Sequence, residues 1–194
     1  MTLDERSPVV VADAGPLIRL AAAGLLGSLR GLNRRIVLVD RVEDEVSADR
    51  TKPFADEIVA WIEAMGPAIE RVRTVEGYGI AALRESADTP EAASLLKRRL
   101  RDSGERAIRE FVEGFEPDDA SAAIILYEDR DAPALMAAAR VPLTLMTTRR
   151  FARLVNDWGI NVDAVAAIEA ITGRYDLKPS TMIEIEPASG SSAK

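Results

Sequence analysis

The sequence predicts an α/β fold, a single domain with an open, mostly parallel sheet flanked by helices on both faces. Short apolar runs recur along the chain, and segments with helical periodicity separate them. Several of these runs end at an acidic residue or at threonine. Strands covered on both faces are continuously apolar, and alternation of strands with helices favours parallel pairing through right-handed crossovers.

The length and composition suit one domain. The chain has 194 residues, of which 47% are hydrophobic, enough for one good core. We expect the domain to span residues 1–175. Residues 176–194 are expected to form a C-terminal extension whose last residues, rich in serine and glycine, are disordered.

The first predicted strand covers residues 9–12 and is followed at once by Asp13. Gly15 permits a tight turn and Pro16 suits the first turn of a helix, whose apolar residues continue at helical spacing to Leu29. Asp13 therefore has two interpretations. It lies in the crevice beyond the strand ends, where ligands of such sheets bind, or it only caps the helix.

The second predicted strand, residues 36–39, also ends at an acid, Asp40. In the helical segment that follows, Val42, Glu45 and Val46 share one face by their spacing. Glu45 is then directed inward with the apolar residues. The alternative is that residues 43–45 are a solvated acidic run.

The middle of the chain, residues 54–101, is long and charged. Apolar residues at helical spacing predict an amphipathic helix over 54–65, with its apolar face in the core. Residues 69–74 alternate weakly and predict an edge strand. Thr89 and Pro90 begin another helix, which ends in the basic run 97–101; this run either complements its own helix dipole or contacts phosphates.

Residues 102–105 open the next helix and place Glu105 in its first turn. Glutamate favours that position in any helix, although the small Gly104 beside it also leaves room for a ligand. The strand predicted over 122–127 then runs into Glu128, Asp129 and Asp131. Neighbouring strand residues face opposite sides, so we choose Asp129 for the cleft and keep Asp131 as the alternative.

A helix over 132–139 leads to a last apolar strand, residues 142–146, which stops at Thr147 and Thr148. Arg149 and Arg150 follow directly and begin a helix that Gly159 closes. A further short helix follows Asp163.

The composition excludes several kinds of chemistry. The chain contains no cysteine and no histidine, so it has no disulfide, no thiolate or imidazole metal ligand and no histidine general base. Oxygen ligands remain, and these favour Mg²⁺ or Mn²⁺. We see no signal-peptide pattern and no apolar run near the ~20 residues of a membrane span, so a cytoplasmic protein without membrane contact is expected.

Acidic residues that follow parallel strands meet at one edge of the sheet. Crowded carboxylates repel one another unless some stay protonated or a cation neutralises them. A divalent metal resolves this repulsion, and it also activates water and stabilises charge on an attacked phosphate. The net charge of −7 argues against indiscriminate adhesion to nucleic acid but is compatible with a local basic rim.

The order of these features resembles the PIN-domain ribonucleases, the fold of VapC-like toxins, over roughly residues 9–159. Five short motifs in order carry the resemblance: Asp13-Ala14-Gly15-Pro16-Leu17, Val42-Glu43-Asp44-Glu45-Val46, Gly104-Glu105-Arg106-Ala107, Glu128-Asp129, and Thr147-Thr148. The segment after Val141 is more similar to a stand-alone branch of the family than to the short toxins.

The resemblance implies a metal-dependent endoribonuclease with four catalytic acids. Asp13, Glu105 and Asp129 are expected to hold Mg²⁺ or Mn²⁺, and Glu45 to orient the surrounding shell or a second ion. Thr147 or Thr148 is expected to position a ligated water or a phosphate. Glu128 and Asp131 are expected to support the site and are the alternatives to Asp129 as the fourth acid. Arg149, Arg150 and the run 97–101 are expected to contact RNA.

The resemblance also implies partners. Toxins of this family are held inactive by an antitoxin protein whose arginine pairs with the cleft acids, and a homodimer is expected. The alternative is a PIN-like module that binds nucleic acid or protein without cutting it. A receiver-like phosphoacceptor domain also gathers acids at strand ends, but no lysine follows the last predicted strand, where that site needs one.

Overall fold

The computed structural model describes residues 8–115 and 123–187. Six strands form one sheet in the order β3-β2-β1-β4-β5-β6. The first five are parallel to their neighbours, and β6 runs antiparallel to β5 at the edge. The strands are β1 (Val9–Ala12), β2 (Ile36–Val39), β3 (Ile69–Val72), β4 (Ala123–Tyr127), β5 (Leu143–Thr147) and β6 (Met182–Ile185).

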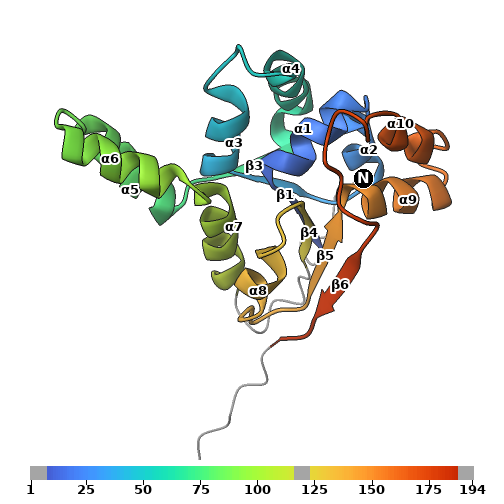
Figure 1. Ribbon diagram of the computed structural model, residues 1–194. Coiled ribbons are helices and arrows are strands. Elements are labelled where there is room, and N and C mark those ends of the chain that lie inside the picture. The colour runs from blue at the N-terminus through green and yellow to red at the C-terminus, as the bar shows by residue number, and fades with distance from the viewer. Residues whose placement is uncertain (1–7, 116–122, 188–194) are drawn as a thin grey trace, which may run out of the picture.

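Helices flank this sheet, with α7 and α8 to one side of it and α1, α2, α9 and α10 to the other (Figure 1). The helices are α1 (Ala14–Ala22), α2 (Leu26–Gly31), α3 (Asp40–Ser47), α4 (Ala55–Met65), the 3₁₀ helix η1 (Gly66–Ala68), α5 (Val75–Glu85), α6 (Pro90–Leu100), α7 (Ser103–Glu113), α8 (Ala132–Met136), α9 (Thr148–Asp157) and α10 (Ala164–Ala170). The predicted α/β fold with a mostly parallel sheet is confirmed.

The four central strands match the apolar runs of the sequence closely. Every residue of β1 and β2 is buried, as expected for strands covered on both faces. Leu17 and Leu20 of α1 and Phe151 of α9 pack into the same core. The predicted edge position of residues 69–72 is also confirmed, because β3 pairs only with β2 among the described strands and exposes Glu70 and Arg71.

Three elements differ from the prediction. The first helical segment is two helices, because Gly24 adopts a left-handed φ of 67° between α1 and α2. Residues 75–85, for which the sequence pattern predicts no helix or strand, form the helix α5. Residues 182–185 of the expected C-terminal extension form β6, which pairs with β5. The serine-rich tail that was expected to be disordered lies outside the described residues.

Helices α5 and α6 form an arm that projects away from the sheet (Figure 1). Ile80 is the buried residue of α5, and every residue of α6 keeps contact with solvent. The base of the arm is fastened by hydrogen bonds to α5: the carboxylate of Glu110 accepts from the N–H groups of Val75 and Glu76, at 2.6 and 3.0 Å. The position of α5 and α6 relative to the sheet thus depends on these contacts at the base of the arm.

Helix α4 confirms the prediction that its apolar face belongs to the core. Ile58, Ile62 and Met65 are buried, and the helix packs against α1, α2 and α3. This face is therefore covered by the chain itself. No helix among the described residues combines the length and apolar character needed to cross a membrane.

Candidate functional site

A cleft of about 640 Å³ opens beyond the carboxyl ends of β1 and β4. These two strands are neighbours at the centre of the sheet, where the order of strands along the chain reverses. Ligands of open α/β sheets bind at this reversal point. The cleft is lined by the start of α1, by α3 and the loop after it, by Arg84 of α5, by residues 100–105 around the start of α7, and by Glu128, Asp129, Asp176 and Lys178.

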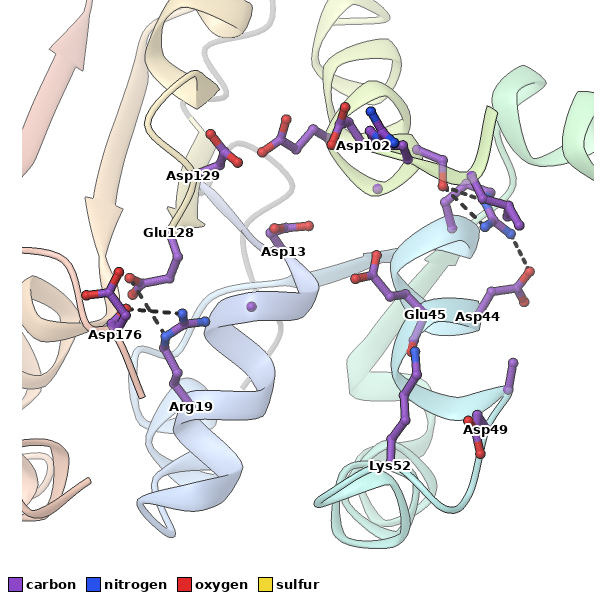
Figure 2. A pocket seen from close by; sticks show the side chains of 18 of the residues that line it. Asp13, Arg19, Asp44, Glu45, Asp49, Lys52, Asp102, Glu128, Asp129 and Asp176 are labelled. Carbon is purple, nitrogen blue, oxygen red and sulfur yellow. Dashed lines mark hydrogen bonds and ion pairs between the residues drawn. The ribbon is translucent and has the colours of Figure 1, made fainter. Parts of the chain in front are cut away.

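Four acidic side chains from different elements meet in this cleft. Asp13 follows β1, Glu45 lies on α3, Glu105 lies in the first turn of α7, and Asp129 follows β4. The backbone N–H of Asp13 donates to the carbonyl of Leu126 at 3.1 Å, which fixes Asp13 beside the end of β4. Figure 2 shows Asp13 between Asp129 and Glu45. The structure thus brings together all four acids that the sequence predicted.

Gly104 allows α7 to approach the acids closely. A Cβ atom at this position would lie 3.1 Å from Oδ1 of Asp13 and 3.5 Å from Oε2 of Glu45. Both carboxylates therefore face the backbone at the start of α7. Any larger residue at position 104 would crowd the acidic centre. Glycine at this position therefore leaves room for the side chains of Asp13 and Glu45.

The acids carry uncompensated negative charge. Burial raises the pKa of Asp13 to about 6; the backbone N–H groups of Ala14 and Gly15 oppose the rise, while the charges of Glu45 and Asp129 add to it. Within the described residues, the Asp13 side chain forms no capping hydrogen bond to α1.

The pKa of Glu105 rises to about 7, first through burial and then through the charges of Asp129 and Asp13. Raised pKa values in a cleft are typical of functional sites.

The donor set fits Mg²⁺ or Mn²⁺ in type, because carboxylate oxygens are the ligands these ions prefer. Among the described residues, however, no three acidic side chains stand close enough together to hold one ion as they are placed here. Repulsion between the carboxylates favours this separation. A bound cation would have to draw the side chains inward.

Glu128 and its neighbour Asp129 face different surroundings. Glu128 is only 6% exposed, and its carboxylate accepts from the N–H groups of Thr148 and Lys178 at 3.0 and 3.1 Å. Arg19 lies 3.9 Å from it, on the side away from Asp129 (Figure 2). Glu128 therefore ties β4 to α9 and to the segment before β6.

Asp129 forms a local turn with Asp131, whose N–H donates to its carboxylate at 2.8 Å. Asp131 itself lines an adjoining hollow, which it shares with Asp102 and Glu105. Of the three candidates for the fourth acid, Asp129 is the one beside Asp13.

The two threonines lie outside the lining of the cleft. Thr147 is the N-cap of α9; its hydroxyl donates to the carbonyl of Pro179 at 2.9 Å and accepts from the N–H of Thr181 at 3.1 Å. Thr148 is fully buried, and its hydroxyl has no partner among the described residues.

The two arginines that follow do not reach the cleft either. The guanidinium of Arg149 makes two 2.9 Å hydrogen bonds to Glu169 of α10 and a third, at 3.0 Å, to the hydroxyl of Thr172. Arg150 is half-buried on α9. Arg149 therefore joins α9 to α10, and the geometry lends no support to a role of either arginine in binding RNA.

Comparison with known proteins adds no relative. The chain matches no protein-family model, no curated protein and no solved structure. The resemblance to PIN-domain ribonucleases therefore stands as a proposal.

The sequence did not predict the basic rim around the acids, except for Arg101, the last residue of the run 97–101. It comprises Arg19, Arg41, Lys52, Arg84, Arg101 and Lys178. A signal existed for Arg41, which precedes Glu45 by four residues and so shares its face of α3. No local signal identifies Arg84, because its place depends on how the arm is attached.

Proposed function

We propose that this protein is a metal-dependent endoribonuclease that hydrolyses RNA phosphodiester bonds in the cleft. The observation that carries the proposal is the meeting of Asp13, Glu45, Glu105 and Asp129 beyond the central strands, inside a rim of arginines and lysines. Acids with raised pKa values attract a divalent cation, and the rim attracts a polyanion. The lining of the cleft contains six arginines and lysines beside nine acids, so the basic side chains would contact phosphate groups while the acids bind the cation.

The roles follow from the positions. Asp13, Glu105 and Asp129 would hold Mg²⁺ or Mn²⁺, directly or through water, and Glu45 would orient the surrounding shell. The ion would supply Lewis acidity and activate water, which replaces the histidine base that the chain lacks. Gly104 leaves room for the carboxylates of Asp13 and Glu45 at the start of α7.

The partners proposed with this activity are RNA, an antitoxin protein and a second copy of the chain, all in the cytoplasm. An arginine of an antitoxin would pair with the same acids that bind the metal, so inhibition would compete with the metal. The apolar face of α4 is buried in the core of this chain, so it is not available to bind an antitoxin. Co-expression with the neighbouring open reading frame, followed by size-exclusion chromatography with light scattering, decides between a heteromeric complex, a homodimer and a monomer.

The test of the activity uses 5′-labelled single-stranded RNAs of varied sequence with Mg²⁺, with Mn²⁺ or with EDTA. The full chain should cut RNA only with metal, and Asp13→Asn and Asp129→Asn should each lower the rate at least 100-fold, because each keeps the shape and removes the charge. Asp56→Asn is the matched control; this exposed acid of α4 pairs with Arg50 at 2.9 Å, away from the cleft.

Cleavage that survives in both cleft variants would place the activity elsewhere or in a contaminant. A wild-type chain that binds these RNAs but never cuts them would instead identify a non-cleaving PIN-like module.

A further inference from the structure

One wall of the cleft contains a buried arginine that is only partly neutralised. Arg41 of α3 is 4% exposed. Its Nε and Nη2 both donate to the single hydroxyl oxygen of Ser103, at 3.3 and 3.2 Å, and its Nη1 donates to Oδ2 of Asp44 at 2.5 Å. Buried charges are costly unless they are fully paired, and a neutral hydroxyl contributes no charge.

A second arginine reaches the same carboxylate from the arm. Nη1 of Arg84, on α5, donates to Oδ2 of Asp44 at 3.2 Å. Two guanidinium groups thus share one oxygen of one acid. The group of Arg41, Asp44 and Arg84 keeps one positive charge, and all three residues line the cleft that contains Glu45. Figure 2 shows Asp44 beside Glu45.

An excess guanidinium charge in a cleft wall suits a phosphate group. The planar guanidinium presents paired N–H donors that match phosphate oxygens, and Arg84 is about half exposed, so it can turn donors toward a ligand. Asp13 and Asp129, which lie on the far side of Glu45 from Asp44 (Figure 2), repel the same phosphate. A phosphate held at Arg41 and Arg84 is therefore kept beside the acidic centre and not in it.

We propose that Arg41 and Arg84, bridged by Asp44, bind a backbone phosphate of the RNA next to the one that is cut. This inference rests on the proposed function. The site is assembled from two parts of the chain, since α3 supplies Arg41 and the arm supplies Arg84. Arg41 is also a positioning residue, because Ser103 immediately precedes Gly104 and Glu105 at the start of α7.

The test is equilibrium binding of a 5′-fluorescein single-stranded RNA to the full chain in EDTA, by fluorescence anisotropy over a series of salt concentrations. Arg84→Gln should weaken binding about ten-fold and lower the slope of log K against log salt by about 0.7, the value for one phosphate contact on a single strand. Arg84→Lys should keep the slope and recover part of the affinity, since lysine keeps the charge without the paired donors.

The matched control is Arg35→Gln. Arg35 precedes β2 at the opposite end of the sheet and pairs with Glu70 at 3.3 Å. The substitution Arg35→Gln removes one positive charge far from the cleft, so it should change neither the RNA affinity nor the salt slope by a comparable amount. A DNA strand of the same sequence should show the same loss for Arg84→Gln, because a phosphate contact does not read the sugar.

The outcomes separate this inference from the proposed function. Equal binding by Arg84→Gln and Arg35→Gln, or a loss confined to RNA, overturns the phosphate site. If the wild type binds RNA and cuts it with Mn²⁺, Arg84→Gln should raise KM with little change in kcat; an unchanged KM refutes the site and leaves the nuclease. RNA that is bound through Arg84 but never cut refutes the nuclease and leaves the site.

Discussion

Replacing Asp13 by asparagine should stabilise the metal-free protein at pH 8, although Asp13 lies in the proposed active site. Burial, opposed by neighbouring N–H groups and increased by the charges of Glu45 and Asp129, raises the pKa of Asp13 from 3.8 to about 6. Each pH unit of such a difference corresponds to about 1.4 kcal/mol, which sets an upper bound of about 3 kcal/mol. Because the side chain keeps some contact with solvent, we expect a gain of about 2 kcal/mol.

The sign follows from proton binding. Between pH 3.8 and about 6 the folded state holds the Asp13 proton more tightly than the unfolded state, so the free energy of unfolding falls as the pH rises through this window. Below the window, Asp13 is protonated in both states and costs nothing. Above it, the full penalty is present in the wild type and absent in the variant.

The assay is urea unfolding of both proteins in EDTA at pH 4 and pH 8. The free energy of unfolding of Asp13→Asn should exceed that of the wild type at pH 8, and this difference should shrink strongly at pH 4. Asp56→Asn, an exposed control, should show no such pH-dependent gap. A variant less stable than the wild type at pH 8 would refute the reasoning, because Asp13 would then be a satisfied helix cap.

Three further predictions concern the metal ion, the space at Gly104 and the packing of α5. Mg²⁺ or Mn²⁺ should raise the Tm of the wild type but not that of Asp13→Asn, with about 2.7 kcal/mol gained at 100 times the dissociation constant; equal shifts in both would place the ion elsewhere. Gly104→Ala should lower the rate of RNA cleavage at least ten-fold with little change in Tm, because its Cβ would lie 3.1 Å from the Asp13 carboxylate; an unaltered rate would count against a crowded acidic centre. Gly77→Ala places a Cβ 1.9 Å from Oδ2 of Asp40 and should lower the free energy of unfolding by about 1–3 kcal/mol, whereas Gly79→Ala has open space and should raise it by up to about 1 kcal/mol. Urea unfolding distinguishes the last two, and similar values for both would contradict the packing of α5.

The central strands could be predicted from the sequence because burial on both faces leaves an uninterrupted apolar run. Strand β6 could not, because it lies at the edge and its residues alternate between exposed and half-buried, with Glu184 among them. Helix α5 contains Gly77 and Gly79, which lower its helix propensity. It is stabilised by contacts from elsewhere in the chain, including Glu110, that no local pattern reveals.

Asp13 and Asp129 were predictable for a topological reason: acids that follow parallel strands meet at one edge. The basic groups of the cleft were less predictable from the sequence. Arg149 follows the last predicted strand and was expected to contact RNA, but Glu169 of a later helix binds it. Arg84 reaches the cleft because the arm is fastened at its base, which depends on residues far away in the sequence. Charge partners across elements are thus the part of the site that sequence patterns describe least well.

The central pairing of β1 with β4 governs when the acidic centre can assemble during synthesis of the chain. Val9 pairs with Ala123, so β1, which Asp13 follows, cannot pair with β4 until most of the chain has been synthesised. At roughly 5–20 residues per second, the ribosome needs on the order of 10 s to pass from one to the other. Long-range pairing of this kind also folds slowly. No nascent chain that lacks β4 holds Asp129 beside Asp13, so the acidic centre is complete only after translation has passed this strand.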